Sequence, residues 1–227
     1  MSRARMTTSS RQRGLSMVEL LIGAAIGLVV AAAAAKLLAG HLRESRSLLL
    51  EARLMQDLRT ATDLVTRDLR RAGYWGAAAS GVWLPGAAGV LANPYAALPP
   101  GSAASDAISF QFSRDASENN SVDSNERFGF RLRNGTLDMQ LGASGWQAVT
   151  DTTMLTVTAF SITPTVQNVS LAGYCAQACA GAACPQQQVR NLAVLLTGRA
   201  VADSGVSRST HSEVRLRNDV ITGTCPV

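Results

Sequence analysis

The chain has 227 residues, of which 47% are hydrophobic and 16% charged, and its formal net charge is +5. This length fits one domain of ordinary size with an appendage. Four arginines lie among residues 1–14, and subtracting them from +5 leaves +1 for the rest of the chain. A body so close to neutral excludes a broad electrostatic footprint for DNA, so no nucleic-acid partner is expected.

An apolar segment follows the basic residues and is long enough to cross a bilayer as a helix. Residues 20–35 are apolar without interruption, and the whole span covers residues 15–38. The preceding arginines predict an N-terminus in the cytoplasm and a C-terminal domain in the periplasm. A cleaved secretory signal peptide is the alternative interpretation, with the small residues 31–35 as its cleavage region.

The sequence after this segment continues with helical periodicity. Apolar residues recur at three- and four-residue steps from Leu48 to Leu69, and residues 41–72 contain no proline or glycine. We therefore expect one continuous helix over residues 15–72, apolar all round in its first half and amphipathic in its second. Gly73 is the expected stop. An uninterrupted helix argues for a retained anchor.

The remainder, residues 73–227, is rich in turns and strands. A long loop is expected over residues 77–105. Alternating aromatic and polar residues predict a strand over residues 107–113, and Asn134-Gly135 predicts a tight hairpin within residues 127–141. In that hairpin the expected facing pairs are Leu132 with Leu137, Phe130 with Met139 and Phe128 with Leu141. Further strands are expected at residues 153–162, 190–199 and 212–218.

These elements together predict an α+β fold. A long N-terminal helix, first transmembrane and then amphipathic, would pack on an antiparallel β-sheet domain. The amphipathic half of the helix supplies the hydrophobic cover that one face of the sheet needs.

The four cysteines all lie in a C-terminal region, residues 175–225. They are Cys175, Cys179, Cys184 and Cys225. An even number of cysteines downstream of an export segment predicts disulfides, and three pairings are open. A zinc site is the alternative, although the cysteine spacing matches no zinc ribbon or finger.

The sequence contains no arrangement that indicates catalysis. Acidic residues are scattered over expected surfaces, and no nucleophile motif, paired carboxylates or metal triad is visible. The acidic, Asn-rich residues 114–127 are expected to be an exposed connection, with Ca²⁺ binding as the alternative. We therefore expect no catalytic residue, metal or cofactor, and a protein that is not an enzyme.

A glutamate, Glu19, lies inside the apolar segment, where a charge costs roughly 2.5–3.5 kcal/mol on insertion scales. It occupies the fifth place after Gly14 in "GLSMVE". A basic leader that ends in Gly, followed by an apolar residue and this Glu, resembles type IV pilin-like proteins. The segment "ATDLVTRDLRRAGYWG", residues 61–76, resembles the PilW family of minor pilins, as does "EVRLRN" at residues 213–218. In "AGYWG", Tyr74 and Trp75 are expected to fold back onto the domain core.

The resemblance implies that a prepilin peptidase removes residues 1–14 by cutting between Gly14 and Leu15, and that the new Leu15 amine is methylated. Many pilins have Phe where this chain has Leu15. The new amine would be a positive charge in an apolar environment, so Glu19 can pair with the amine of its own chain or of a neighbouring subunit. Gly23 and Gly27 form a G-x-x-x-G pair that permits close helix packing, although small residues are common in membrane helices.

The implied function is that of a minor pilin of a type IV pilus, which helps to initiate assembly and lies at the pilus tip. Its implied partners are prepilin peptidase, other minor pilins, the major pilin and an assembly platform in the inner membrane. It would reside in the inner membrane before it enters the pilus on the cell surface. Two alternatives remain open: a minor pseudopilin of a type II secretion system, and a ligand-binding adhesin or DNA-uptake subunit.

Overall fold

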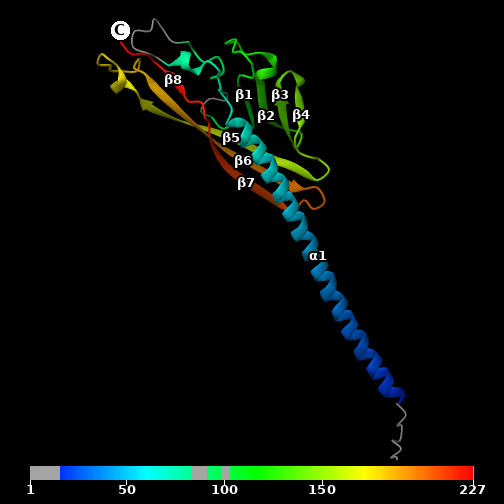
Figure 1. Cartoon of the computed structure of the whole chain (residues 1–227). Coiled ribbons are helices and arrows are strands. Elements are labelled where there is room, and N and C mark those ends of the chain that lie inside the picture. The colour runs from blue at the N-terminus through cyan, green and yellow to red at the C-terminus, as the bar shows by residue number, and fades with distance from the viewer. Residues whose placement is uncertain (1–15, 83–90, 99–102, 227) are drawn as a thin grey trace, which may run out of the picture. The chain divides into compact units, whose positions relative to one another are not determined.

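The computed structural model describes residues 16–82, 91–98 and 103–226. The chain forms two compact units, Met1–Leu48 and Leu49–Val227. Helix α1 covers Met17–Leu69, so it begins in the first unit and ends in the second (Figure 1). The predicted continuous helix is confirmed over this range. The helix ends three residues before the predicted position, because the chain from residue 70 onward forms a turn.

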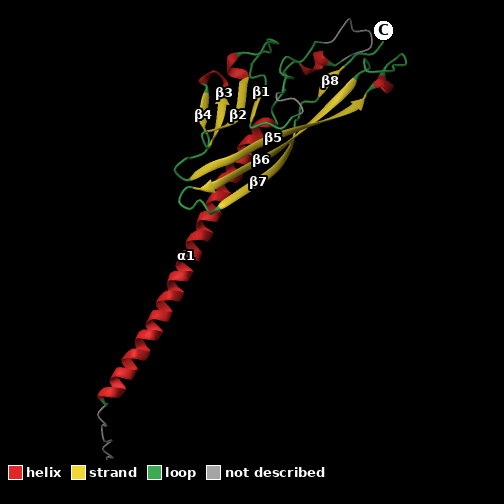
Figure 2. Ribbon diagram, turned by 180° about the vertical axis from the view of Figure 1, so that it is seen from behind, coloured by secondary structure: helices red, strands yellow, loops and turns green. Residues whose placement is uncertain are grey.

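Eight strands in the described part of Leu49–Val227 form two antiparallel sheets (Figure 2). The first sheet has the order β1-β2-β3-β4 and the second has the order β5-β6-β7, with β8 also paired to β6. The bounds are Ala107–Gln111 for β1, Arg127–Arg133 for β2, Thr136–Leu141 for β3, Trp146–Ala148 for β4, Leu155–Ser170 for β5, Gln186–Ala200 for β6, Ser207–Arg215 for β7 and Val220–Thr222 for β8.

One hydrophobic core joins the C-terminal part of α1 to both sheets. The buried apolar residues of the helix recur at three- and four-residue steps, as an amphipathic helix requires; they are Leu54, Leu58, Ala61, Val65 and Leu69. Leu58 lies against Gly198 of β6, and the Thr62 hydroxyl is 2.7 Å from the Thr210 hydroxyl of β7. At the edge of this contact, Arg208 forms an ion pair with Glu51 at 2.6 Å. The α+β architecture, a long helix packed on antiparallel sheets, is therefore confirmed.

The predicted hairpin forms with the predicted register. Asn134 and Gly135 have φ values of 51° and 77°, which are the left-handed conformations that a two-residue turn needs. All three facing pairs are present: Phe128 with Leu141, Phe130 with Met139, and Leu132 with Leu137. The outer end of this face is less covered, since Leu141 is 37% exposed.

The other strands differ from prediction mainly in length. β5 and β6 continue well past the expected residues and flank the cysteine region, and the short strands β4 and β8 were not predicted. The extra parts pair Val166–Ser170 with Gln186–Arg190. Both faces of β5 are exposed there, so this part of the strand shows no alternation of buried and exposed residues. Backbone hydrogen bonds alone define this extension of the two strands, and such bonds cannot be predicted from a pattern of apolar residues.

The turn after α1 connects the helix to the first sheet. Gly73 adopts φ +74°, its N–H donates to the Gln111 carbonyl at 2.8 Å, and the Ser113 N–H donates to the Tyr74 carbonyl. Trp75 is 3% exposed, as predicted for an aromatic of the core, but Tyr74 is 51% exposed. The prediction for Tyr74 was therefore wrong: of the two rings, only that of Trp75 is buried, and it lies against Gly81.

Candidate functional site

The N-terminal part of α1 presents an apolar surface with no cover from its own chain. Every residue from 16 to 46 is exposed. The helix contains a stretch that is long and apolar enough to cross a membrane. A soluble domain does not expose so many large aliphatic side chains, so this surface needs an apolar environment such as lipid or neighbouring helices.

Glu19 lies in the first turn of α1. The Leu20 N–H, next to it, donates to the Ser16 carbonyl at 3.1 Å. A carboxylate in the first turn is favoured by the positive end of the helix dipole. Gly14 and Leu15, the residues of the expected processing site, lie outside the described residues.

Gly23 and Gly27 follow Glu19 at successive steps of four residues. An added Cβ at either glycine would meet no atom within 4 Å. Ala31 and Ala35 continue the same series, so four small residues form one row behind a single carboxylate. Rows with a spacing of four residues are the ridges and grooves along which helices pack, and small residues let the backbones approach closely. Sequence reasoning had found only the glycine pair of this row.

In the second unit, a buried carboxylate organises the connection between β1 and β2. Glu126 is 0% exposed, and its side chain accepts hydrogen bonds from the Arg114 N–H at 2.8 Å and the Asp123 N–H at 2.9 Å. Together with the Asp123 side chain it forms a capping box for the short helix Ser124–Glu126. The expectation that acidic residues lie only on surfaces was wrong here. Apart from Glu126, residues 114–127 are exposed or partly exposed, as predicted for a connection between strands.

Tyr95 closes the same cluster from another segment of the chain. Its hydroxyl oxygen lies 3.1 Å from a carboxylate oxygen of Glu118 and 3.2 Å from one of Glu126, so its single proton has two carboxylate acceptors within reach. Burial, followed by the hydrogen bond to Glu118, raises the pKa of Tyr95 well above its ordinary value. Nearby, the Trp75 indole N–H donates to the Asn120 side chain at 2.8 Å. The cluster thus attaches the turn after α1 to the β1–β2 connection.

Glu118 belongs to this cluster as an ionised group. Burial opposes its ionisation, but hydrogen bonds from the Ser113 side chain and from the Asn120 and Gly76 N–H groups outweigh burial and lower the pKa of Glu118. The carboxylate therefore acts as a fixed acceptor in a network of structural contacts.

Arg190 of β6 ties the end of α1 to the C-terminal strands. Its guanidinium donates to the Ala96 carbonyl at 2.7 Å and to the Asn218 carbonyl at 3.0 Å, and the Asn218 amide donates to the Ala72 carbonyl. Burial lowers the pKa of Arg190, and the charge of Asp219 partly opposes this effect. The buried guanidinium thus joins the segments at Ala96 and Asn218, and Asn218 in turn bonds to the end of the helix.

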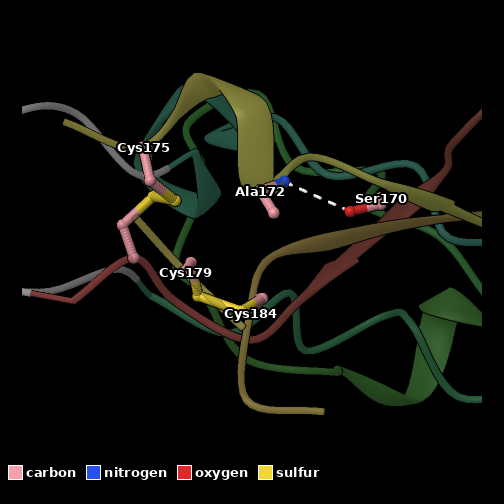
Figure 3. Close-up of a disulfide and its surroundings, with 6 residues drawn as sticks. Ser170, Ala172, Cys175, Cys179 and Cys184 are labelled. Carbon is pink, nitrogen blue, oxygen red and sulfur yellow. Dashed lines mark hydrogen bonds between the residues drawn. A yellow bond between two sulfur atoms is a disulfide. The ribbon is translucent and has the colours of Figure 1, made fainter. Parts of the chain in front are cut away.

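Two disulfides close the cysteine region (Figure 3). Cys175 pairs with Cys225 and Cys179 pairs with Cys184, so none of the four cysteines is free. The first bridge attaches the C-terminal segment to the loop between β5 and β6. The described residues contain no group of three or more His, Cys, Asp and Glu side chains that could hold a metal ion.

A helix with an exposed apolar half and a half packed on antiparallel sheets, with a carboxylate in its first turn, defines a type IV pilin-like protein. The comparison with protein families agrees with this class, since the prokaryotic N-terminal methylation motif matches residues 9–35. The family described as prepilin peptidase-dependent protein B matches residues 47–216, which is more than half of the chain. The chain belongs to this family. Neither a curated protein nor a solved structure matches it significantly.

Proposed function

We propose that the chain is a minor pilin of a type IV pilus, of the PilW type, which helps to initiate pilus assembly and lies at the pilus tip. The observation that carries the proposal is the exposed apolar half of α1, which starts within the matched methylation motif and leads without a break into the packed half. A helix of this kind can leave lipid and enter the helical core of a filament while the sheet domain stays outside.

Prepilin peptidase processes the chain in this proposal. It cuts between Gly14 and Leu15, removes the leader of residues 1–14 and exposes an amine that is then methylated. The helix of residues 15–72 is kept, and its part from 15 to 38 anchors the protein in the inner membrane. Residues 73–227 lie in the periplasm until the subunit enters the pilus. The match to a family named for its dependence on prepilin peptidase supports this order of events.

Glu19 acts as the registration residue for assembly. In an apolar environment an unpaired carboxylate and an unpaired amine are both costly, so the register that pairs Glu19 with a Leu15 amine is favoured. The row that begins with Gly23 and Gly27 then allows close contact with a neighbouring helix. Such neighbours would be the other minor pilins and the major pilin, assembled on a platform in the inner membrane.

Deletion of the gene tests the proposal against its nearest alternative. Electron microscopy of surface filaments and an assay of protein secretion are made on the same deletion strain and on a strain complemented with the wild-type gene. Loss of pili with normal secretion is the expected result. Normal pili with blocked secretion would instead make the chain a minor pseudopilin of a type II secretion system, which shares the leader and the long helix.

A further inference from the structure

Five arginines line one hollow of about 580 Å³ at the end of α1. Arg67, Arg70 and Arg71 are neighbours at the end of α1, and two more, Arg114 and Arg217, come from distant segments. The rest of the lining is Tyr74, Phe112, Ser113 and Asn218, so no acidic residue lines this arginine cleft. Since like charges repel, their convergence needs a reason beyond chance surface composition.

Capping of the helix does not explain the arginine cleft. Basic residues near a helix C-terminus commonly hydrogen-bond the last carbonyls. Here other groups already occupy those carbonyls: the carbonyls of residues 68–71 accept backbone N–H groups, and those of Ala72 and Gly73 accept the side-chain amides of Asn218 and Asn93. The arginine side chains are therefore not used as caps.

Internal ion pairing accounts for only part of the charge. Arg67 and Arg71 share one carboxylate, Asp68, at 3.6 Å and 3.5 Å. Among the described residues, Arg70 and Arg217 make no ion pair and no side-chain hydrogen bond. In the part of the chain that the structure describes, three of the five arginines thus make no ion pair, and one of these three, Arg114, donates to the Asn125 carbonyl at 3.5 Å. An anionic ligand would relieve this repulsion.

We propose that the arginine cleft binds the phosphodiester backbone of a single nucleic-acid strand. Guanidinium groups bind phosphate oxygens in a bidentate manner, and several in one hollow suit phosphates in series. Tyr74 lies in the same lining and is half-exposed, so its ring can stack on a base. Arg71 already covers the face of Phe112 at 4.3 Å, which leaves Tyr74 as the accessible ring. A hollow with a stacking ring favours a strand over a flat bilayer surface.

This inference departs from the expectation drawn from net charge. A charge of +1 on the body is a sum over the chain, whereas a strand responds to the charges within about one Debye length, roughly 8–10 Å. The site is independent of the proposed role in pilus assembly, because none of its residues lies in the unit Met1–Leu48.

Fluorescence anisotropy with a labelled oligothymidylate of twelve nucleotides tests the proposal on the full-length protein in a non-ionic detergent. The double variant Arg70→Gln/Arg217→Gln removes the two unpaired charges. The matched control Arg127→Gln/Arg133→Gln removes two charges from exposed positions of β2. We expect only the first variant to lose affinity, by about tenfold or more. The slope of the logarithm of its association constant against the logarithm of the salt concentration should become shallower by about 1.4, because each of two lost phosphate contacts contributes about 0.7. Thermal unfolding of both variants checks that the fold is intact.

Tyr74 supplies the second readout. Tyr74→Leu is expected to weaken binding by about fivefold or more, and Tyr74→Phe to restore it, because only the aromatic ring stacks on a base. Equal affinity of the Arg70/Arg217 variant and its control would overturn the proposal. So would binding to vesicles that contain phosphatidylglycerol in the absence of binding to the oligonucleotide, which would make the cleft a membrane contact.

Discussion

The two disulfides close loops of very different length, and this difference predicts unequal contributions to stability. The sequence separation is 50 residues for Cys175–Cys225 and 5 residues for Cys179–Cys184. The loop-closure relation gives about 4 kcal/mol at 25 °C for the first bridge and about 2 kcal/mol for the second. The paired substitution Cys175→Ser/Cys225→Ser should therefore cost about 2 kcal/mol more than Cys179→Ser/Cys184→Ser.

The folded structure supports the same order. Next to Cys225, the Thr224 N–H donates to the Ala183 carbonyl, and β8 pairs with β6 just before it. Loss of the long bridge would release this segment as well. Guanidinium unfolding of the full-length protein in a non-ionic detergent, followed by tryptophan fluorescence, measures both variants against the wild type. An equal loss in the two variants, or a larger loss without the short bridge, would refute the reasoning from loop closure.

Three further predictions concern the packing, the buried phenol and the hairpin. Leu58→Ala should destabilise the domain by about 2.7–5.0 kcal/mol, because Leu58 is fully buried. The control Leu49→Ala, on the exposed side of α1, should change the free energy of unfolding by less than about 0.5 kcal/mol, and chemical unfolding measures both variants. Because folding raises the pKa of Tyr95, its contribution to stability is complete below the ordinary pKa of about 10 and is lost as the pH rises above that value. Tyr95→Phe removes this dependence, so it should flatten the alkaline part of a curve of melting temperature against pH. Gly135→Ala should lower the free energy of unfolding by about 1–2 kcal/mol, because Gly135 has φ +77° and an added Cβ would lie 2.8 Å from the Thr156 methyl. An unchanged melting temperature would argue against the left-handed turn.

The parts of the fold that were predicted correctly depend on local patterns. Asn134 and Gly135 specify their turn, and alternation on both sides of that turn fixes the register. The helical periodicity likewise identifies the helix and, from Leu58 to Leu69, its buried face, whereas Leu48 and Leu49 of the same apolar series are exposed. In each case, residues close in sequence determine the structure.

The features that were missed depend on residues that are distant in sequence. The disulfide pairing follows from the way β8 returns to β6, and the burial of Glu126 follows from Tyr95, which lies 31 residues away. The arginine cleft combines residues as far apart as Arg67 and Arg217, and the total charge of the chain conceals it. At the N-terminal site the motif identified Glu19 and the glycine pair. The continuation of that pair into a longer row of small residues was not predicted.

The central claim is that the chain is cut before its apolar helix and enters a pilus with that helix intact. Mass spectrometry of the subunit, in sheared, purified pili and in the periplasmic fraction, tests this claim most directly. The account predicts a subunit whose first residue is Leu15, with a methylated amine and all later residues present. A subunit cut within residues 31–35 and found free in the periplasm would contradict it, because the segment would then be a signal peptide and its helix would be lost.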